Sequence, residues 1–124
     1  MALKSPGNIC KIMRAIPFVS VVIPVYNDSV RLKTCLQALE AQTYPKEVYE
    51  VIVVDNGSDE SIEPVVAEFP QARASYETHP GSYAARNKGV SISRGEVLAF
   101  TDLDDILAPD WIEILCSNSL DIIR

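Results

Sequence analysis

Three aspartates lie within four positions, at Asp102, Asp104 and Asp105, directly after the apolar run EVLAF. Carboxylates this close repel one another, so the pattern suggests that a cation lies among them. Mg²⁺ and Mn²⁺ prefer oxygen ligands and are often held by one or two carboxylates together with substrate phosphates. Because side chains two positions apart in an extended segment project to one side, Asp102 and Asp104 can share such an ion. Asp105 is then the one expected to be structural.

The same aspartates also fit a solvated acidic loop that caps a helix beginning near Pro109. Their position directly after an apolar strand favours the metal site. The chain has no G-x-G-x-x-G after its first strand and no G-x-x-x-x-G-K-[ST]. Glycine-rich phosphate cradles are therefore disfavoured. A carboxylate-bound Mg²⁺ or Mn²⁺ remains as the expected means of holding a diphosphate, and one of these ions is the expected cofactor.

Two further groups could contact a nucleotide. Asp55 and Asn56 open the segment DNGS, which is either a simple turn or a place where an acid or amide meets a base or ribose. Arg86 lies either on an exposed helix face or beside a phosphate. Tyr26 either stacks on a base or closes the core. His79, the only histidine, is expected to be a surface residue and receives no role.

Hydrophobic periodicity predicts the elements that position these residues. Apolar, β-branched runs indicate four strands, at 18–26, 49–55, 72–78 and 96–100. Apolar residues at helical spacing between them indicate helices over 32–39, 62–69, 82–93 and 109–123. Asn27, Asp28 and Ser29 offer N-cap side chains for the first helix. The alternation predicts an α/β fold with an open, mostly parallel sheet and helices on both faces.

Ligands of open parallel sheets bind beyond the carboxyl ends of the strands, near the point where the strand order changes direction. Each predicted strand ends in polar residues. They are Asn27 and Asp28 after the first strand, Asp55 to Ser58 after the second, Thr78 and His79 after the third, and Asp102 to Asp105 after the fourth. The sequence therefore predicts one polar site at this edge of the sheet.

Length and composition describe an ordinary small domain. The chain has 124 residues and a net charge of −6, which argues against nucleic acid as a partner. Its three cysteines are widely spaced, so a reducing cytoplasm is the predicted location, either free or at the cytoplasmic face of a membrane. Residues 1–17 are expected to form a poorly ordered lead-in, and residues 18–124 the folded domain.

Taken together, several segments resemble the family 2 glycosyltransferases, which have the GT-A fold, a nucleotide-binding fold of the Rossmann-like kind. The matching pieces fall in the family's order across about residues 18–115. They are VSVVIPVYND (19–28), CLQALEAQTYP (35–45), YEVIVVDNGSDE (49–60), GSYAARNKGVSISRGEVLAFTDLDD (81–105) and PDWIE (109–113). Each is weak alone, and their combination is specific.

The resemblance implies an inverting transferase that uses a nucleotide-diphosphate sugar. It places Pro24, Val25 and Tyr26 in the base pocket and Asp28 near the nucleotide. Asp55 and Asn56 match an acidic pair that contacts the base, although the second member here is an amide.

On the phosphate side, the resemblance makes Arg86 a cation near the nucleotide. Asp102 then faces the ribose and the metal, and Asp104 is the direct metal ligand. The family's catalytic base has no counterpart in this chain and is expected beyond Arg124. The chain is therefore interpreted as the donor-binding part of a longer enzyme, truncated before its acceptor half.

Other functions and partners are left open at this stage. A non-catalytic nucleotide-sugar-binding or interaction module is the alternative. A nucleotidyltransferase is disfavoured because PVYNDS is neither glycine-rich nor basic. The acceptor is unassigned among saccharides, lipid-linked molecules and proteins. An uncovered sheet edge predicts association with a second copy of the chain.

Overall fold

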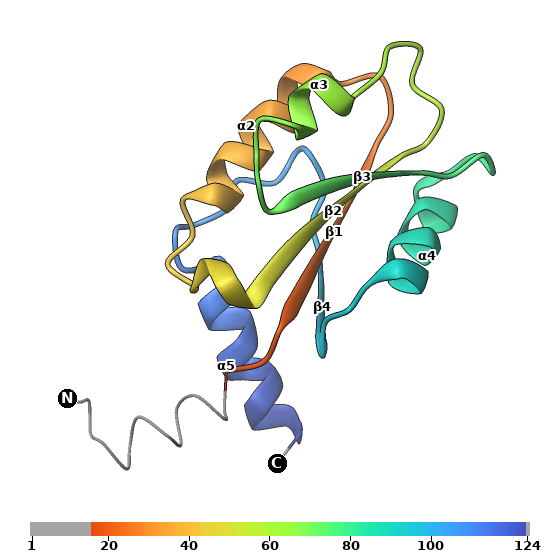
Figure 1. Cartoon of the computed structure of the whole chain (residues 1–124). Coiled ribbons are helices and arrows are strands. Elements are labelled where there is room, and N and C mark those ends of the chain that lie inside the picture. Colours follow the sequence, from red (N-terminus) through yellow and green to blue (C-terminus); the bar gives the residue numbers. More distant parts are fainter. Residues whose placement is uncertain (1–15, 124) are drawn as a thin grey trace.

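The computed structural model describes residues 16–123, and the side chains of residues 16–117. Its strands are β1 (Val19–Val25), β2 (Tyr49–Asp55), β3 (Ala72–Tyr76) and β4 (Val97–Phe100). Its helices are α2 (Ser29–Glu40), α3 (Glu63–Val66), α4 (Ser82–Ile92) and α5 (Trp111–Ile123), with a 3₁₀ turn η1 at Lys46–Val48. The predicted alternation of strands and helices is confirmed (Figure 1).

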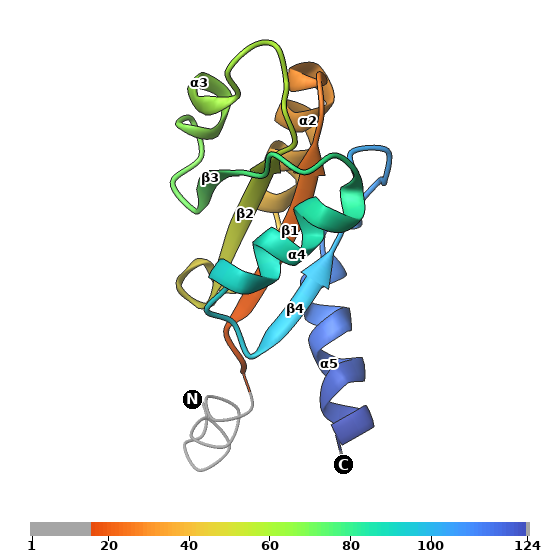
Figure 2. The same ribbon diagram turned by 90° about the vertical axis from the view of Figure 1, so that its right-hand side faces the viewer.

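The sheet has the strand order β3-β2-β1-β4, and all of its pairs are parallel. The chain first builds outward from β1 to β3 and then returns to place β4 on the other side of β1. Because parallel crossovers are right-handed, this reversal moves the connecting helix to the opposite face of the sheet. Figure 2 shows α4 lying across one face, with α2 and α5 beyond the sheet.

A separate apolar layer covers each face of the sheet. The larger layer joins alternate β1 residues such as Val21 and Ile23 to α2, α3 and α5. The smaller layer joins Val22, Ile52 and Val54 to Ala85 of α4. Successive β1 residues therefore point into different layers, as the two-residue period of a strand requires. The predicted fold, an open parallel sheet with helices on both faces, is confirmed.

The second predicted helix is much shorter than expected. Apolar spacing predicted a helix over 62–69, whereas α3 covers only Glu63–Val66. Beyond Val66 the backbone tightens, since the Glu68 and Phe69 N–H groups donate to the carbonyls three residues back, and Pro70 then prevents the helix from resuming. Ile62, Val66 and Phe69 are nevertheless buried against α2 and the sheet, as the spacing predicted.

Helix α4 lies unusually close to the sheet. A Cβ atom added to Gly89 would overlap the side chain of Val22 in β1. Only glycine permits this approach, since any other residue would push the helix outward. Gly89 therefore sets the height of α4 above the sheet.

A buried carboxylate joins the strands near their amino ends. Glu50 of β2 is 4% exposed and accepts from the Ser20 hydroxyl at 2.6 Å. It also accepts from Arg73 Nε at 3.2 Å and from the Arg94 backbone N–H at 2.9 Å. Burial by itself raises the pKa of Glu50, but these partners outweigh it and hold the pKa below the ordinary value of 4.5. The sequence analysis did not identify this cluster.

The structure describes only residues 16 and 17 of the predicted lead-in. Most of the predicted lead-in, residues 1–15, lies outside the described residues, while the Pro17 carbonyl accepts from the Tyr44 hydroxyl at 2.5 Å.

Strand β4 lies at one edge of the sheet and leaves Leu98 and Phe100 partly exposed. Association with a second copy stays a prediction. Between residues 16 and 123, no helix combines the length and the apolar character needed to cross a membrane.

Glu50→Gln should lower the free energy of unfolding by about 2 kcal/mol near neutral pH, because it leaves two guanidinium groups without their carboxylate. The folded-state pKa of Glu50 is depressed, so its stabilisation is present above the unfolded pKa and is lost as the pH falls through the folded pKa. The difference between the variant and the wild type should therefore shrink below pH 4.5 in urea unfolding experiments. Glu47→Gln, at an exposed position, is the control. An equal effect of both variants would contradict the assignment.

Gly89→Ala should lower the free energy of unfolding by roughly 2 kcal/mol, because the added methyl group overpacks the contact with Val22. Thermal unfolding measures the change. Asn87→Ala, at an exposed position of the same helix, should be neutral or slightly stabilising because alanine is the better helix former. A stabilised Gly89→Ala variant would show that α4 does not approach the sheet this closely.

Candidate functional site

A cleft of about 340 Å³ lies at the carboxyl ends of β1 and β4. This is the point where the strand order changes direction, so it is where an open parallel sheet is expected to bind a ligand. All of the predicted site residues except Asp55 line the cleft. The lining residues are Pro24, Val25, Tyr26, Asp28, Asn56, Ser82, Arg86, Asp102, Leu103 and Asp104. Ser82 and Leu103 were not among the predicted site residues.

The β1 side of the cleft is held by a network between two loops. Asn27 has a left-handed backbone, with a φ of 51°. Its side-chain oxygen accepts from the Asp59 N–H at 2.8 Å, and its own N–H donates to the Ser58 hydroxyl at 2.8 Å. Tyr26, just before it, is 63% exposed and does not close the core. The network therefore leaves the Tyr26 ring free at the rim of the cleft.

Asp28 begins helix α2 and also faces the cleft. Its carboxylate accepts from the Arg31 backbone N–H at 3.1 Å, which makes it the N-cap. The predicted capping segment is thereby confirmed. Because this carboxylate stabilises the positive end of a helix, it has a structural partner whether or not a ligand is present.

Asp105 organises the acidic loop after β4. Its carboxylate accepts from the Asp102 N–H and from the Thr101 hydroxyl, each at 3.0 Å. The Asp102 N–H first, and the Thr101 hydroxyl second, hold the pKa of Asp105 below its ordinary value. Asp105 therefore folds the loop and leaves the side chains of Asp102 and Asp104 to the cleft.

An arginine accompanies each of these two aspartates. Arg86 of α4 contacts Asp102, with Nη2 and Oδ1 3.1 Å apart. Arg31 of α2 pairs with Asp104 and also approaches Asp28 at 3.5 Å. The two guanidinium groups come from helices on opposite faces of the sheet, and they offset the repulsion between the carboxylates. Arg31 was not among the predicted site residues, and no motif in the sequence identifies it.

Asp55 and Asn56 are neighbours with different environments. Asp55 is 5% exposed and accepts from the Ser58 N–H at 3.1 Å, so it closes the turn after β2 and does not line the cleft. Asn56 lines the cleft, and its side chain also bonds to the connection between β3 and α4. The turn interpretation therefore describes Asp55.

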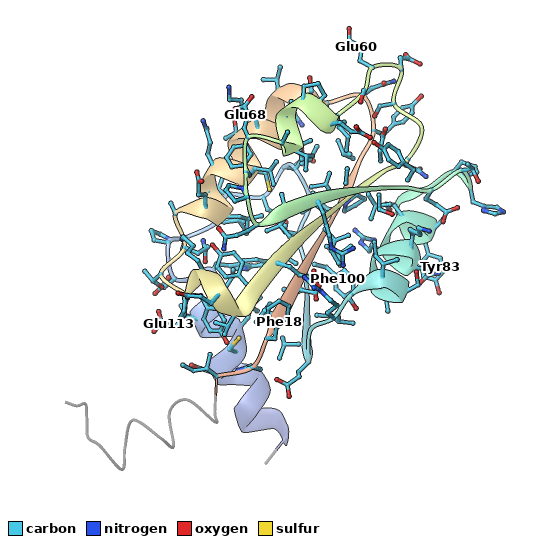
Figure 3. All side chains as sticks on the ribbon, in the orientation of Figure 1. Phe18, Glu60, Glu68, Tyr83, Phe100 and Glu113 are labelled. Atoms are coloured by element: carbon cyan, nitrogen blue, oxygen red, sulfur yellow. The ribbon has the colours of Figure 1, made fainter. Side chains whose placement is uncertain are left out.

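Other polar groups lie outside the cleft. His79 is exposed and pairs with Glu77, as expected of a surface residue. A second hollow of about 250 Å³ lies beyond Asp28, between the loops that follow β1 and β2. In Figure 3, Glu60 marks the outer tip of the latter loop and Tyr83 projects from α4.

Asp102 and Asp104 offer the hard oxygen atoms that Mg²⁺ and Mn²⁺ prefer. Within the described residues, no group of three or more His, Cys, Asp or Glu side chains is arranged to hold a metal by itself. These ions commonly take one or two carboxylates and complete their shell with phosphate oxygens and water. The pair therefore fits an ion that binds together with a diphosphate.

The fold and cleft define an α/β domain with a polar cleft at its topological switch point. Residues 20–118 match the model of the family described as Glycosyl transferase family 2. The chain belongs to this family, and the resemblance noted from the sequence is confirmed.

Individual relatives show the same relationship. Glycosyltransferase AglE of Haloferax volcanii is 46% identical over 103 residues, which are 79% of this chain and 34% of AglE. S. aureus TarS (residues 1–349), in complex with UDP, superposes with a TM-score of 0.72 and 25% identity, over 83% of this chain and 32% of TarS. The mannosyltransferase PcManGT from Pyrobaculum calidifontis, in complex with GDP-Man and Mn²⁺, gives 0.67 and 27%, over 81% and 30%. The chain therefore spans about a third of the length of these relatives.

Asp105→Ala should increase the rate of amide hydrogen exchange at Asp102, because it removes the acceptor of that N–H. Exchange followed by NMR or mass spectrometry measures the change. Asp110→Ala, at an exposed position after the same loop, should leave the Asp102 amide unchanged. Unaltered protection in Asp105→Ala would show that Asp105 does not fold the loop.

Proposed function

We propose that this chain binds the nucleotide-diphosphate sugar of a glycosyl transfer reaction, together with Mg²⁺ or Mn²⁺. The observation that carries the proposal is the cleft itself, which joins an exposed aromatic ring, an arginine and two aspartates at the switch point. The complexes of TarS with UDP and of PcManGT with GDP-Man and Mn²⁺ support this choice of ligand.

The β1 side of the cleft receives the base. Tyr26 offers an exposed ring for stacking, beside Pro24 and Val25. Asn56 lines the same cleft, and its side chain is bonded to the connection between β3 and α4. Asp55 supports this wall through the turn it closes.

The β4 side receives the diphosphate. Asp102 and Asp104 hold the divalent ion, and Arg86 offsets the negative charge of the phosphates. When bound, the ion supplies Lewis-acid stabilisation of the charge on the departing diphosphate. Arg31, released from Asp104, adds a second positive charge at the mouth of the cleft.

Transfer also requires a base that removes a proton from the acceptor hydroxyl, with inversion at the anomeric carbon. The cleft carboxylates have other partners, because Asp28 caps α2, Asp102 meets Arg86 and Asp104 meets Arg31. We therefore assign the base to a part of the enzyme outside these residues. The present chain is the donor-binding part.

Calorimetry with UDP and with GDP, each with and without Mn²⁺, tests the proposal. One of the two nucleotides or both should bind about tenfold more tightly with Mn²⁺, because the ion joins the carboxylates of the cleft to the diphosphate. Asp104→Ala should abolish that gain, whereas Asp110→Ala, outside the cleft, should preserve it. Equal affinity in EDTA would refute the metal site, and no affinity for either nucleotide would refute donor binding.

A further inference from the structure

The side chain of Asn56 makes three hydrogen bonds to one connecting segment. Its Nδ2 donates to the Glu77 carbonyl at 3.0 Å and to the His79 carbonyl at 2.7 Å. Its Oδ1 accepts from the Gly81 N–H at 2.8 Å. Both hydrogens of the amide are thus used within the protein.

Only an amide satisfies this arrangement. An aspartate of the same shape can accept from Gly81 but has no hydrogen for the two carbonyls, which would then face a negative charge. Asn56 therefore matches the segment by chemistry as well as by size. This explains an amide where the resemblance led us to expect a second acid.

The segment held by Asn56 leads directly into helix α4. It leaves β3, turns and leads into α4, as Figure 1 shows. Gly81 is the N-cap, with a φ of 105°, and has no side chain with which to cap the helix. Since its N–H is bonded to Asn56, the start of α4 is fixed to the end of β2.

Helix α4 is attached to the sheet at several points along its length, including the packing of Ala85 on Val22, Ile52 and Val54. Asn56 holds its start at Gly81, and Gly89 rests against Val22 of β1. Arg86 lies between these points and reaches Asp102. Losing the hydrogen bonds of Asn56 would loosen the N-terminal turn of α4 while Ala85 and Gly89 stay packed on the sheet. Arg86 follows that turn and would shift relative to Asp102.

We infer that Asn56 is a positioning residue that sets the placement of Arg86 against Asp102 by anchoring the start of α4. The inference rests on the proposed function for the consequence at the diphosphate, but the anchoring is a property of the ligand-free chain. It differs from a direct contact between Asn56 and the base, because the effect of Asn56 on binding then passes through Arg86.

Asn56→Asp removes both donors while keeping the shape, and Asn87→Asp adds the same charge at an exposed position of α4. In the ligand-free chain, Asn56→Ala, which removes the acceptor of the Gly81 N–H as well as both donors, should speed amide exchange at Gly81 by about tenfold. Asn56→Asp, which keeps that acceptor but loses both donors, should shift the Arg86 Nε–H signal in NMR spectra. Asn87→Asp should leave the Gly81 exchange rate unchanged and move the Arg86 signal less. Asn56→Ser, which removes the amide without adding charge, is the second variant should Asn56→Asp fail to fold.

A double-mutant cycle with Arg86→Ala separates positioning from direct contact. Asn56→Asp should weaken Mn²⁺-dependent binding of UDP or GDP by about fivefold in the wild type and by less than about twofold in Arg86→Ala. An equal loss in both backgrounds would overturn the inference and make Asn56 a direct contact. Unchanged Gly81 exchange in Asn56→Ala would overturn it as well. Absence of nucleotide binding by the wild type would refute the proposed function, and the ligand-free measurements would still decide the role of Asn56.

Discussion

Right-handed crossovers between parallel strands decide where the polar residues of this chain meet. Two successive connections carry the sheet from β1 to β3 along one face, and the third returns across β1 on the other. As a result, β1 has neighbours on both sides and its carboxyl end lies between helices of opposite faces. Asp28 at the start of α2, Arg86 in α4 and the aspartates after β4 can therefore line one cleft.

The amino ends and the carboxyl ends of the strands carry similar charged groups that serve different purposes. At the amino ends, Glu50 is buried and surrounded by Ser20, Arg73 and Arg94, so its charge is fully engaged within the fold. At the carboxyl ends, Asp102 and Asp104 are largely exposed, and each is paired with an arginine at the surface. Exposed ion pairs contribute little stability and exchange partners readily, whereas buried ones are costly to break. The cleft at the carboxyl ends of the strands can therefore accept a charged ligand without unfolding the sheet.

Helix α4 links these electrostatics to packing. Gly89 lets it approach β1 closely, and Asn56 fixes its first turn to the end of β2. Arg86 lies between these two contacts, next to Ala85, which packs on the sheet. The position of the Arg86 guanidinium in the cleft thus depends on Gly89, which has no side chain to hold α4 away from β1. It also depends on the Asn56 amide at the end of β2.

The sequence by itself determined the elements, their order and the polar character of their ends. Apolar periods of two and of about 3.6 are local properties, so they can be read without knowing which elements touch. The role of Asp105 and the capping segment before α2 were also local and therefore predictable. The failure at α3 was local too, since the apolar spacing ran on to Phe69 while the backbone left the α-helical pattern after Val66.

Only the tertiary structure decided which side chains meet. Arg31 reaches Asp104 across 73 positions, Glu50 collects partners from three other segments, and Asn56 bonds to residues more than twenty positions away. Asp55 turned out to close a turn while its neighbour Asn56 lines the cleft. Such pairings depend on strand order, register and helix height. These are set by crossovers and close packing between distant segments, and no local period encodes them.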